Sequence, residues 1–254
     1  MSITNQALTG KNVVVIGGGR GIGAAVADGF RDAGSNVTVV HHATEGPDLA
    51  ATDQITIDIS RKDDVERAFR ELDATIETLD VVVNAMDIGG AVGPSEQLAT
   101  EEWRRVIDTN LSGPFWVCQE AGRRMIPRGQ GSIVNVTSFG AVRVVRGHHQ
   151  VQYNASKAGI VGMTQALAQE WGRFGVRVNA VAEGSHRAQE PELFDGDQAR
   201  LDEHLAKART STPLDRLADA SEIVPLVLFL GSDDSAYLTG DLVVADGGRG
   251  LGVD

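Results

Sequence analysis

Short apolar segments alternate with longer amphipathic segments along most of the chain. The apolar segments, which predict buried β-strands, are residues 13–16, 37–40, 55–59, 81–83, 133–137, 176–181 and 242–244. The amphipathic segments, which predict helices, are residues 22–33, 62–78, 101–125, 154–174 and 221–230. Strands that are apolar on both faces are typical of a parallel sheet covered by helices, and their alternation with helices indicates βαβ units. The pattern therefore predicts an α/β fold with a doubly wound parallel sheet and helices on both of its faces.

Nothing in the sequence suggests a division into several domains. We find no internal repeat, no low-complexity segment and no linker rich in Pro, Gly or Ser. The long irregular stretch, residues 184–215, is polar and charged and lies between the last two predicted strands. Long loops of this kind are often functional, so we predict that it forms a substrate lid with a short helix.

Charge and cysteine content narrow the partners and the compartment. The 254 residues carry a formal net charge of −12, which disfavours binding to nucleic acid and to anionic membranes. The sequence starts without the pattern of a signal peptide, and no apolar run approaches the roughly 20 residues of a membrane span. A single cysteine, Cys118, cannot form an intrachain disulfide, fits a reducing compartment and lies in a segment typical of helix packing. We expect a cytoplasmic protein with no membrane or nucleic-acid partner.

A glycine-rich turn, "GGGRGIG", directly follows the first predicted strand and opens the first predicted helix. Bare backbone N–H groups at a helix N-terminus favour an anionic pyrophosphate through hydrogen bonds and the helix dipole. The candidate cofactor contacts in this turn are Gly17, Gly19, Arg20, Gly21, Ile22 and Gly23. The spacing differs from G-x-G-x-x-G, so a tight turn without a ligand remains the alternative.

The segment "YNASK" adds candidate chemistry. Tyr153 and Lys157 are four residues apart, so on a helix they share one face. A cation close to a phenol stabilises the phenolate, and we therefore expect the pKa of Tyr153 to be lowered. Such a pair is often solvent-exposed and has no catalytic role, but together with a dinucleotide turn it indicates an acid/base site.

These segments, together with "LTGDLVVADGG" near the C-terminus, resemble the classical short-chain dehydrogenases/reductases from Lys11 to Gly248. The resemblance implies one Rossmann-like catalytic domain over residues 1–254. It also implies hydride transfer between a nicotinamide cofactor, NADP or NAD, and a small-molecule carbonyl or secondary alcohol substrate.

The resemblance also implies roles for individual residues. Tyr153 would be the acid/base, Lys157 its activator and a ribose ligand, and Ser138 the group that holds the substrate carbonyl. Asn110 of "DTNLSG" would kink its helix and support a proton-relay water. Asp58 would contact the adenine, and Asn84 would lie beside the adenosine ribose. The further cofactor contacts are His41, Ile59, Gly184, Tyr153 and Lys157.

Several positions depart from the family pattern. Ile16 replaces a threonine before the glycine turn, and Met86 ends the segment that resembles N-N-A-G. Glu183 replaces a proline beside the nicotinamide; its carboxylate would either attract the oxidised ring or turn to solvent. Ser138 and Tyr153 are fifteen residues apart, slightly more than is usual in the family. A non-catalytic dinucleotide-binding protein with a drifted nicotinamide pocket is therefore the alternative function.

The end of the second predicted strand bears on the choice of cofactor. NAD-preferring members usually carry a carboxylate there, which binds the ribose 2′-hydroxyl. This chain has His41 and His42 instead, and Arg20 lies in the glycine turn. We predict a preference for NADP over NAD, with a solvated strand end as the alternative role of the histidines.

The resemblance and the charge pattern suggest further partners. Arg143, Arg146, His148 and His149 lie in the loop between Ser138 and Tyr153, which the family places at the mouth of the substrate pocket. One hypothesis is an anionic substrate; a solvated loop or a subunit contact is the alternative. Family members commonly form homotetramers or homodimers, and the predicted helices at 101–125 and 154–174 carry apolar stripes suited to such packing.

Overall fold

Seven parallel strands form the sheet of the protein. The computed structural model describes residues 5–42, 54–144, 149–186 and 198–251. From one edge to the other, the strands are β3 (Gln54–Ile57), β2 (Asn36–His42), β1 (Asn12–Ile16), β4 (Val81–Asn84), β5 (Gly131–Ser138), β6 (Val176–Glu183) and β7 (Leu242–Ala245). Every neighbouring pair is parallel. The predicted doubly wound α/β sheet is confirmed.

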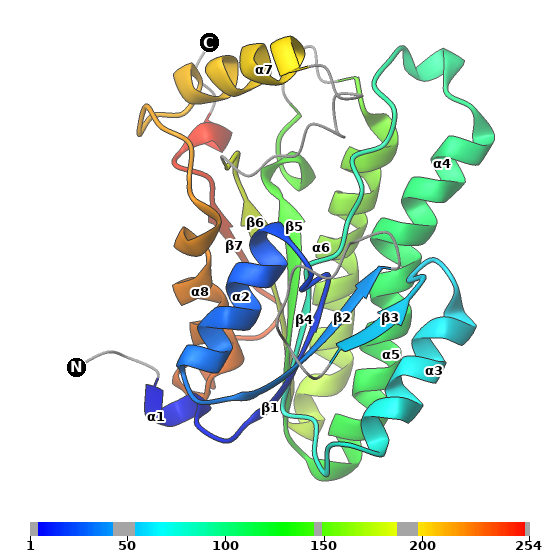
Figure 1. Ribbon diagram of the computed structural model, residues 1–254, viewed down its shortest axis with the longest axis vertical. Coiled ribbons are helices and arrows are strands. Elements are labelled where there is room, and N and C mark those ends of the chain that lie inside the picture. The colour runs from blue at the N-terminus through cyan, green and yellow to red at the C-terminus, as the bar shows by residue number, and fades with distance from the viewer. Residues whose placement is uncertain (1–4, 43–53, 145–148, 187–197, 252–254) are drawn as a thin grey trace.

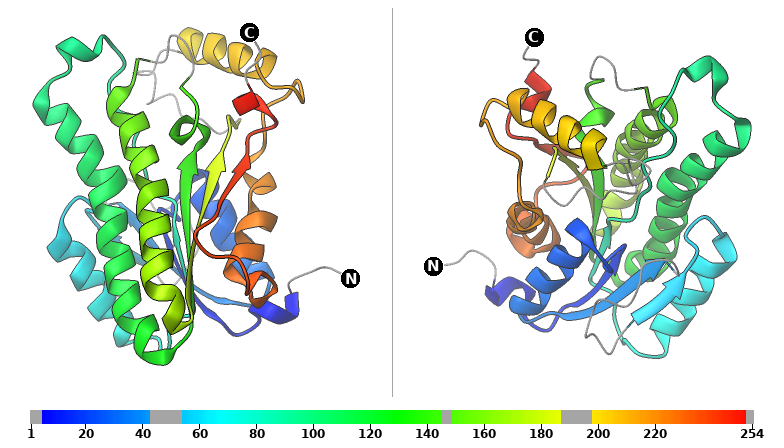
Figure 2. Two further views of the ribbon diagram at one scale, coloured as in Figure 1. Left: turned by 180° about the vertical axis from the view of Figure 1, so that it is seen from behind. Right: turned by 45° about the horizontal axis from the view of Figure 1, so that its top comes forward.

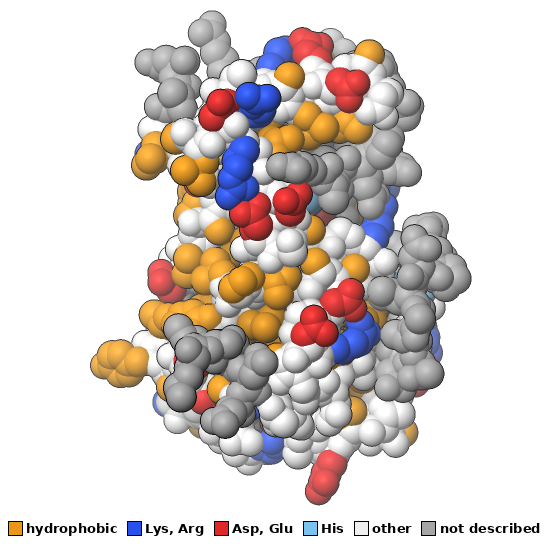
Figure 3. All heavy atoms as spheres, turned by 60° about the vertical axis from the view of Figure 1, so that its left-hand side comes forward, with side chains coloured by type: hydrophobic (Ala, Val, Ile, Leu, Met, Phe, Trp, Pro, Cys, Tyr) orange, Lys and Arg blue, Asp and Glu red, His pale blue; other side chains and the backbone are white. Residues whose placement is uncertain are grey.

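Helices cover both faces of this sheet (Figures 1 and 2). One face carries α3 (Lys62–Asp73), α5 (Gly113–Met125) and α6 (Val151–Trp171). α4 (Thr100–Ile107) precedes α5 and leads into it. The other face carries α1 (Asn5–Leu8), α2 (Gly21–Asp32) and α8 (Val224–Gly231), and α7 (Gln198–Thr210) lies beyond the carboxyl ends of the strands. Hydrophobic side chains gather on the outside of the face that carries α2 and α8 (Figure 3).

The alternation of side chains along each strand divides the core into two clusters. In β1, Val14 and Ile16 pack with α3, α5 and α6, whereas Val13 and Val15 pack with α2 and α8. All four are essentially fully buried. The strands are thus apolar on both faces, as the sequence pattern indicates, and the polar residues within them, such as Asn135 and Asn179, are buried and hydrogen-bonded.

Two predicted elements differ from the structure for local reasons. The helix predicted at 62–78 ends at Asp73, because the carbonyl of Leu72 accepts the backbone N–H groups of both Thr75 and Ile76 and the hydroxyl of Thr75. The helix predicted at 101–125 is interrupted by a π-helical turn over Asp108–Ser112, just before Gly113 and Pro114 start α5. Among the described residues, none of the helices is long and apolar enough to cross a bilayer.

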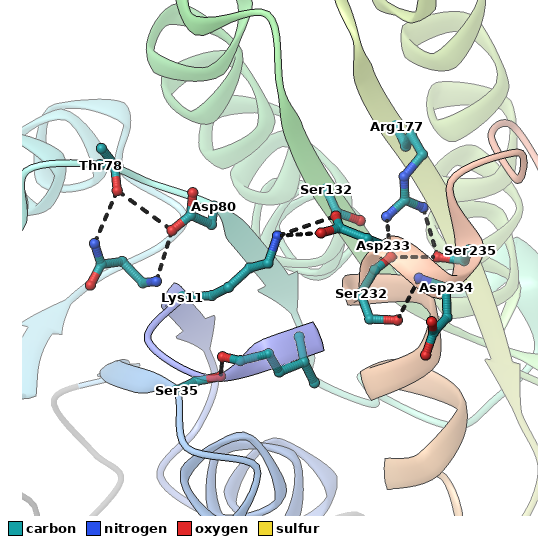
Figure 4. Close-up of polar contacts among 12 residues, drawn as sticks. Lys11, Ser35, Thr78, Asp80, Ser132, Arg177, Ser232, Asp233, Asp234 and Ser235 are labelled. Carbon is teal, nitrogen blue, oxygen red and sulfur yellow. Dashed lines mark hydrogen bonds and ion pairs between the residues drawn. The ribbon is translucent and has the colours of Figure 1, made fainter. Parts of the chain in front are cut away.

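The amino-terminal end of the sheet is closed by a polar network around Arg177 (Figure 4). Its guanidinium donates to the carbonyl oxygens of Leu230 (3.0 Å), Ser232 (2.8 Å) and Leu238 (3.3 Å), and to the hydroxyl of Ser235 (2.9 Å). One side chain on β6 thus binds the end of α8 and the segment that leads to β7. The network fixes the far end of the sheet and leaves the carboxyl end open.

We expect Arg177→Met to lower the free energy of unfolding by about 3 kcal/mol, because charged hydrogen bonds contribute strongly and their acceptor carbonyls would lose their donors. The control is Lys11→Met, which removes an ion pair to an exposed carboxylate, Lys11 Nζ to Asp233 Oδ2 at 3.0 Å. We expect this change to cost about 0–1 kcal/mol. Urea unfolding at one protein concentration measures both, and equal losses would contradict the assignment.

Candidate functional site

The candidate site residues lie at the carboxyl ends of the strands. β1 is followed by Gly17, Asp87 lies three residues beyond the end of β4, and β5 and β6 end at Ser138 and Glu183. The chain winds outward in opposite directions from β1 and β4, which are neighbours in the sheet. Ligands of such sheets bind in the crevice at this switch point.

The glycine turn packs too closely for side chains. A Cβ on Gly17, whose φ is +84°, would lie 2.6 Å from the Cα of Met86, and a Cβ on Gly23 would overlap the carbonyl oxygen of Gly17. Gly21 also has a positive φ, +55°. No side chain caps the first turn of α2, whose leading N–H groups lack partners within the helix. This bare helix N-terminus beside the β1–β4 crevice fits a pyrophosphate, and it explains the glycines better than a mere tight turn.

The remaining residues of the turn support this arrangement. Gly19 is buried, and Ile22 packs against the core cluster below α2. Arg20 is the N-cap of α2 and is exposed. It therefore lies where β1 passes into α2, beside the switch point of the sheet.

The two histidines of β2 have different surroundings. The ring of His41 is buried, with Nδ1 at 3.1 Å from the carbonyl of His42 and Nε2 at 3.3 Å from the hydroxyl of Thr56 on β3. His42 is partly exposed, and its Nε2 lies 3.9 Å from Asp58 Oδ1. The ring of His42 is therefore more accessible than that of His41 at the carboxyl end of β2.

Asp58 and Ile59 lie just beyond β3. The carboxylate of Asp58 accepts the backbone N–H of Ser60 (3.0 Å) and its hydroxyl (2.6 Å), which fixes the loop before α3. Ile59 is fully buried. The backbone N–H of Asp58 donates to Asp64 Oδ2 at 3.1 Å, so the strand predicted to reach residue 59 ends at Ile57.

Asn84 directs its side chain into the protein core. Its amide donates to Asn135 Oδ1 at 2.8 Å, while its own buried Oδ1 has no hydrogen-bond partner. Met86 is also buried, within the cluster below α5. Where these residues approach the crevice, they do so with backbone atoms.

Three of the four candidate catalytic side chains form one cluster. Lys157 Nζ lies 5.5 Å from the centre of the Tyr153 ring, and the side chain of Ser138 is close enough to Tyr153 to act on its pKa. The hydroxyl of Thr137 donates to the carbonyl of Lys157 at 2.9 Å, which fixes α6 against β5. The shared helix face of Tyr153 and Lys157 is confirmed.

Asn110 lies at the π-helical turn between α4 and α5. Its side chain accepts the N–H of Ile88 (2.9 Å), donates to the carbonyl of Ile88 (2.8 Å) and contacts the Ser156 hydroxyl (3.3 Å). The interrupted helix expected around this residue is present. Asn110 thus ties the loop after β4 to the helix that carries Tyr153 and Lys157.

Asp87 joins this cluster, although the sequence analysis did not single it out. Its Oδ2 accepts the Tyr153 hydroxyl at 3.2 Å and the Lys157 ammonium at 2.7 Å. Burial opposes its ionisation, but the charge and hydrogen bond of Lys157 and the hydrogen bond from Tyr153 outweigh burial and lower the pKa of Asp87. Its place just after a central parallel strand is the signal that could have indicated it.

The expected lowering of the pKa of Tyr153 is wrong. Burial, the nearby charges of Asp87 and Glu183, and the hydrogen bond to Asp87 raise the pKa of Tyr153 well above its usual value, against a smaller effect of the Ser138 hydrogen bond. Lys157 does not reverse this, because its ammonium is paired with Asp87. Tyr153 is thus held as a phenol.

Glu183 points into the protein rather than into solvent. Its carboxylate is 15% exposed and lies 3.2 Å from Nδ1 of His186. Burial lowers the pKa of His186, but the hydrogen bond and the charge of Glu183 outweigh burial, so the pKa of His186 is raised. In the sheet Glu183 is directly beside Ser138, so the alternative that it turns to solvent is wrong.

The C-terminal segment closes one side of the site. A Cβ on Gly184 would lie 2.6 Å from the Cα of Asp246, so only glycine allows this approach. Arg249, which the sequence analysis also missed, stacks on the Phe139 ring at 4.7 Å and donates to the hydroxyl of Ser185. It packs against the residue that follows Ser138.

The structure describes part of the loop between Ser138 and Tyr153, which carries the arginines and histidines of the anionic-substrate hypothesis. Arg143 and His149 are exposed, whereas Arg146 and His148 lie outside the described residues. The anionic-substrate hypothesis therefore stays a prediction. The helix expected within residues 184–215 is α7, but residues 187–197 lie outside the described residues, and the lid role also stays a prediction.

Cys118 has the structural setting that its sequence indicated. It is fully buried in α5, where burial raises the pKa of its thiol to about 12. It is not a nucleophile of the site.

Comparison with known proteins agrees with this geometry. Residues 16–249 match the family model described as enoyl-(acyl carrier protein) reductase. The chain is 35% identical to a 3-oxoacyl-(acyl-carrier-protein) reductase from Chlamydia muridarum, over 96% of this chain and 99% of that protein. It is 33% identical to a D-threitol dehydrogenase from Mycolicibacterium smegmatis, over 95% and 93% of the two chains.

A solved structure agrees as well. It comes from Beutenbergia cavernae, is assigned provisionally to an NAD(P)-dependent gluconate 5-dehydrogenase, and holds NADP at low occupancy. The match covers 97% of this chain and 99% of that one, with 31% identity and a TM-score of 0.87. The chain is thus an NAD(P)-dependent oxidoreductase that belongs to the short-chain dehydrogenase/reductase family.

Proposed function

We propose that Tyr153, Lys157, Ser138 and Asn110 form the active site for the interconversion of a carbonyl and a secondary alcohol. The observation that carries this proposal is the partly buried Tyr153 hydroxyl, which shares one cluster with Ser138 and Lys157 at the carboxyl end of the sheet. The names of the relatives argue against a non-catalytic dinucleotide-binding protein.

The residues of the crevice fit a dinucleotide cofactor. Gly17 and Gly23 leave the space that Cβ atoms would fill, and the N-terminus of α2 offers N–H groups to a pyrophosphate. We propose that Asp58, Ile59 and the backbone near Asn84 hold the adenosine part. When bound, the nicotinamide supplies or accepts the hydride.

Side chains of the protein orient the substrate oxygen and exchange a proton with it. Ser138 donates a hydrogen bond to the substrate oxygen and so orients the reacting carbon. Tyr153 gives its proton to that oxygen during reduction and accepts the proton of the hydroxyl during oxidation. Asn110 fixes the backbone of Ile88 beside α6, and thereby the loop that carries Asp87.

We take polyols and sugars as the first substrates to assay. One relative is named for D-threitol, and the related solved structure is described as a gluconate dehydrogenase. Another relative is named for 3-oxoacyl groups, so 3-oxoacyl thioesters form the second set. Matched charged and neutral compounds within each set also test the anionic-substrate hypothesis.

We propose NADP(H) as the preferred cofactor and NAD(H) as the weaker one. Arg20 is exposed at the start of α2, and a partly exposed histidine, His42, ends β2 in place of a carboxylate. A guanidinium suits the 2′-phosphate of NADP, which a carboxylate would repel.

We propose further that the protein is a cytoplasmic homotetramer or homodimer. The single cysteine and the acidic composition support the compartment. Partly exposed aromatic side chains on α4 and α5, those of Trp103 and Phe115, support packing of these helices against another copy.

Replacement of the acid/base tests the catalytic proposal. We expect Tyr153→Phe to lower kcat by about 10²–10⁴-fold with little change in cofactor Kd, because only the transferable proton is lost. The control is Tyr237→Phe, at the chain's other tyrosine, which is fully exposed. Cofactor absorbance with the substrate sets above measures the rates. Binding of cofactor without turnover of any substrate by the unmodified chain would favour the non-catalytic alternative.

Loss of the turn's cation tests the cofactor preference. We expect Arg20→Ala to raise the Kd of NADPH by roughly tenfold or more, as for loss of one charged hydrogen bond, and to change that of NADH much less. Arg31→Ala is the control, since Arg31 lies at the other end of the same helix and pairs with Asp28. Fluorescence titration gives both constants, and tighter binding of NADH by the unmodified chain would refute the preference.

The close packing of the glycine turn gives a separate prediction. A methyl group on Gly23 overlaps the Gly17 carbonyl and must displace the turn, so Gly23→Ala should weaken both cofactors by at least about tenfold. The control is Gly172→Ala, where the added methyl group meets no atom within 4 Å. Unchanged affinity for both cofactors in Gly23→Ala would remove this turn from the cofactor site.

A further inference from the structure

One carboxylate oxygen lies at the centre of the candidate active site. Asp87 Oδ2 is 2.7 Å from the Lys157 ammonium and 3.2 Å from the Tyr153 hydroxyl. The phenol therefore donates its proton toward a carboxylate rather than accepting a hydrogen bond from the lysine. This orientation is the opposite of the one in which a cation would prepare Tyr153 as a phenolate.

The loop that carries Asp87 is held in place from both sides. Asn110 accepts the N–H and binds the carbonyl of Ile88, the next residue, and the backbone of Met86, the preceding one, lies against Gly17. The Asp87 side chain is 36% exposed, whereas that of Lys157 is 5% exposed. The contact with Tyr153 and Lys157 is thus set by the fixed backbone on either side.

We propose that Asp87 is a positioning residue, whose carboxylate joins the Lys157 ammonium and the Tyr153 hydroxyl in one hydrogen-bonded triad and keeps Tyr153 protonated as a proton donor. The proposal rests on the role proposed above for Tyr153. Two effects act together: the carboxylate neutralises the charge of Lys157, and a phenolate at this position would face a like charge. The triad thus populates the protonated form of Tyr153, which is the form that reduction of a carbonyl requires.

The other groups around Tyr153 do not reverse this effect. Glu183 approaches from β6 as a second carboxylate and acts in the same direction as Asp87. His186 follows β6 and is paired with Glu183, while Ser138 on β5 contributes a neutral hydrogen bond. Lys157, on α6, is the cation of the triad itself, and Asp87 binds it.

The chain allows a direct test without substrate or cofactor. It has only two tyrosines, so in a Tyr237→Phe background Tyr153 is the sole tyrosine. Its ionisation can then be followed by ultraviolet absorbance, with circular dichroism to limit the data to the folded range. We expect Asp87→Asn to move the ionisation of Tyr153 to lower pH by about 1–3 units, because a like charge is removed and the charge of Lys157 is released.

Two further variants separate a local from a general charge effect. Asp233→Asn removes an exposed carboxylate at the opposite end of the sheet and should leave the Tyr153 titration unchanged. Asp87→Ser removes the same charge with a smaller side chain and should act like Asp87→Asn, which keeps the test valid if either variant folds poorly. If Tyr153 ionises at the same or a higher pH in the folded Asp87 variant, the proposal is overturned.

The unmodified chain provides an independent measurement. Comparison of its titration with that of Tyr153→Phe isolates the ionisation of Tyr153, which should lie above the pH range usual for a tyrosine. Ionisation within or below that range would also overturn the proposal.

A pH profile links the triad to turnover. In Asp87→Asn, the rate of alcohol oxidation should reach its plateau at a lower pH than in the unmodified enzyme, since oxidation requires the phenolate. If Tyr153→Phe remained active, the proposed function of Tyr153 would fail, whereas the titration would still measure the coupling between Asp87 and Tyr153.

Discussion

Burial of both faces of the central strands is the constraint on which the rest of the structure depends. Val13 to Ile16 of β1 face α2 and α8 on one side and α3, α5 and α6 on the other, with no exposed position among them. Such strands cannot carry exposed polar side chains along their length. Chemistry is therefore restricted to the strand ends, and the two ends of the sheet have different roles.

The amino end of the sheet is closed by a cation that satisfies backbone carbonyls. Arg177 binds three of them from the end of α8 and the segment before β7. At the carboxyl end, by contrast, glycines replace side chains where β1 meets the loop after β4, and Tyr153, Lys157 and Asp87 bind one another. One end thus provides stability, while the other gathers charged groups around an open crevice.

Sequence patterns predicted much of this fold because they reflect burial directly. The valine-rich strands and the shared face of Tyr153 and Lys157 follow from local periodicity, which the core then enforces. Asp87 could not be assigned in this way, because its partners on α6 are more than sixty residues away along the chain. The expected direction of the pKa shift of Tyr153 was wrong for the same reason. The local motif supplies the cation, but the distant loop supplies the carboxylate that neutralises it. The contact of the buried His41 ring with Thr56 also could not be predicted from the local sequence, because it depends on the register of β2 and β3.

The setting of Cys118 has a consequence for the redox behaviour of the protein. Thiols are oxidised through the thiolate, and a thiol with a pKa of about 12 in a fully buried position is almost entirely protonated near neutral pH. It is also the sole cysteine of the sequence. Peroxides and disulfide reagents should therefore react slowly, if at all, with the thiol of the folded protein. Oxidants that act on cysteine should leave its activity unchanged as long as the fold is intact.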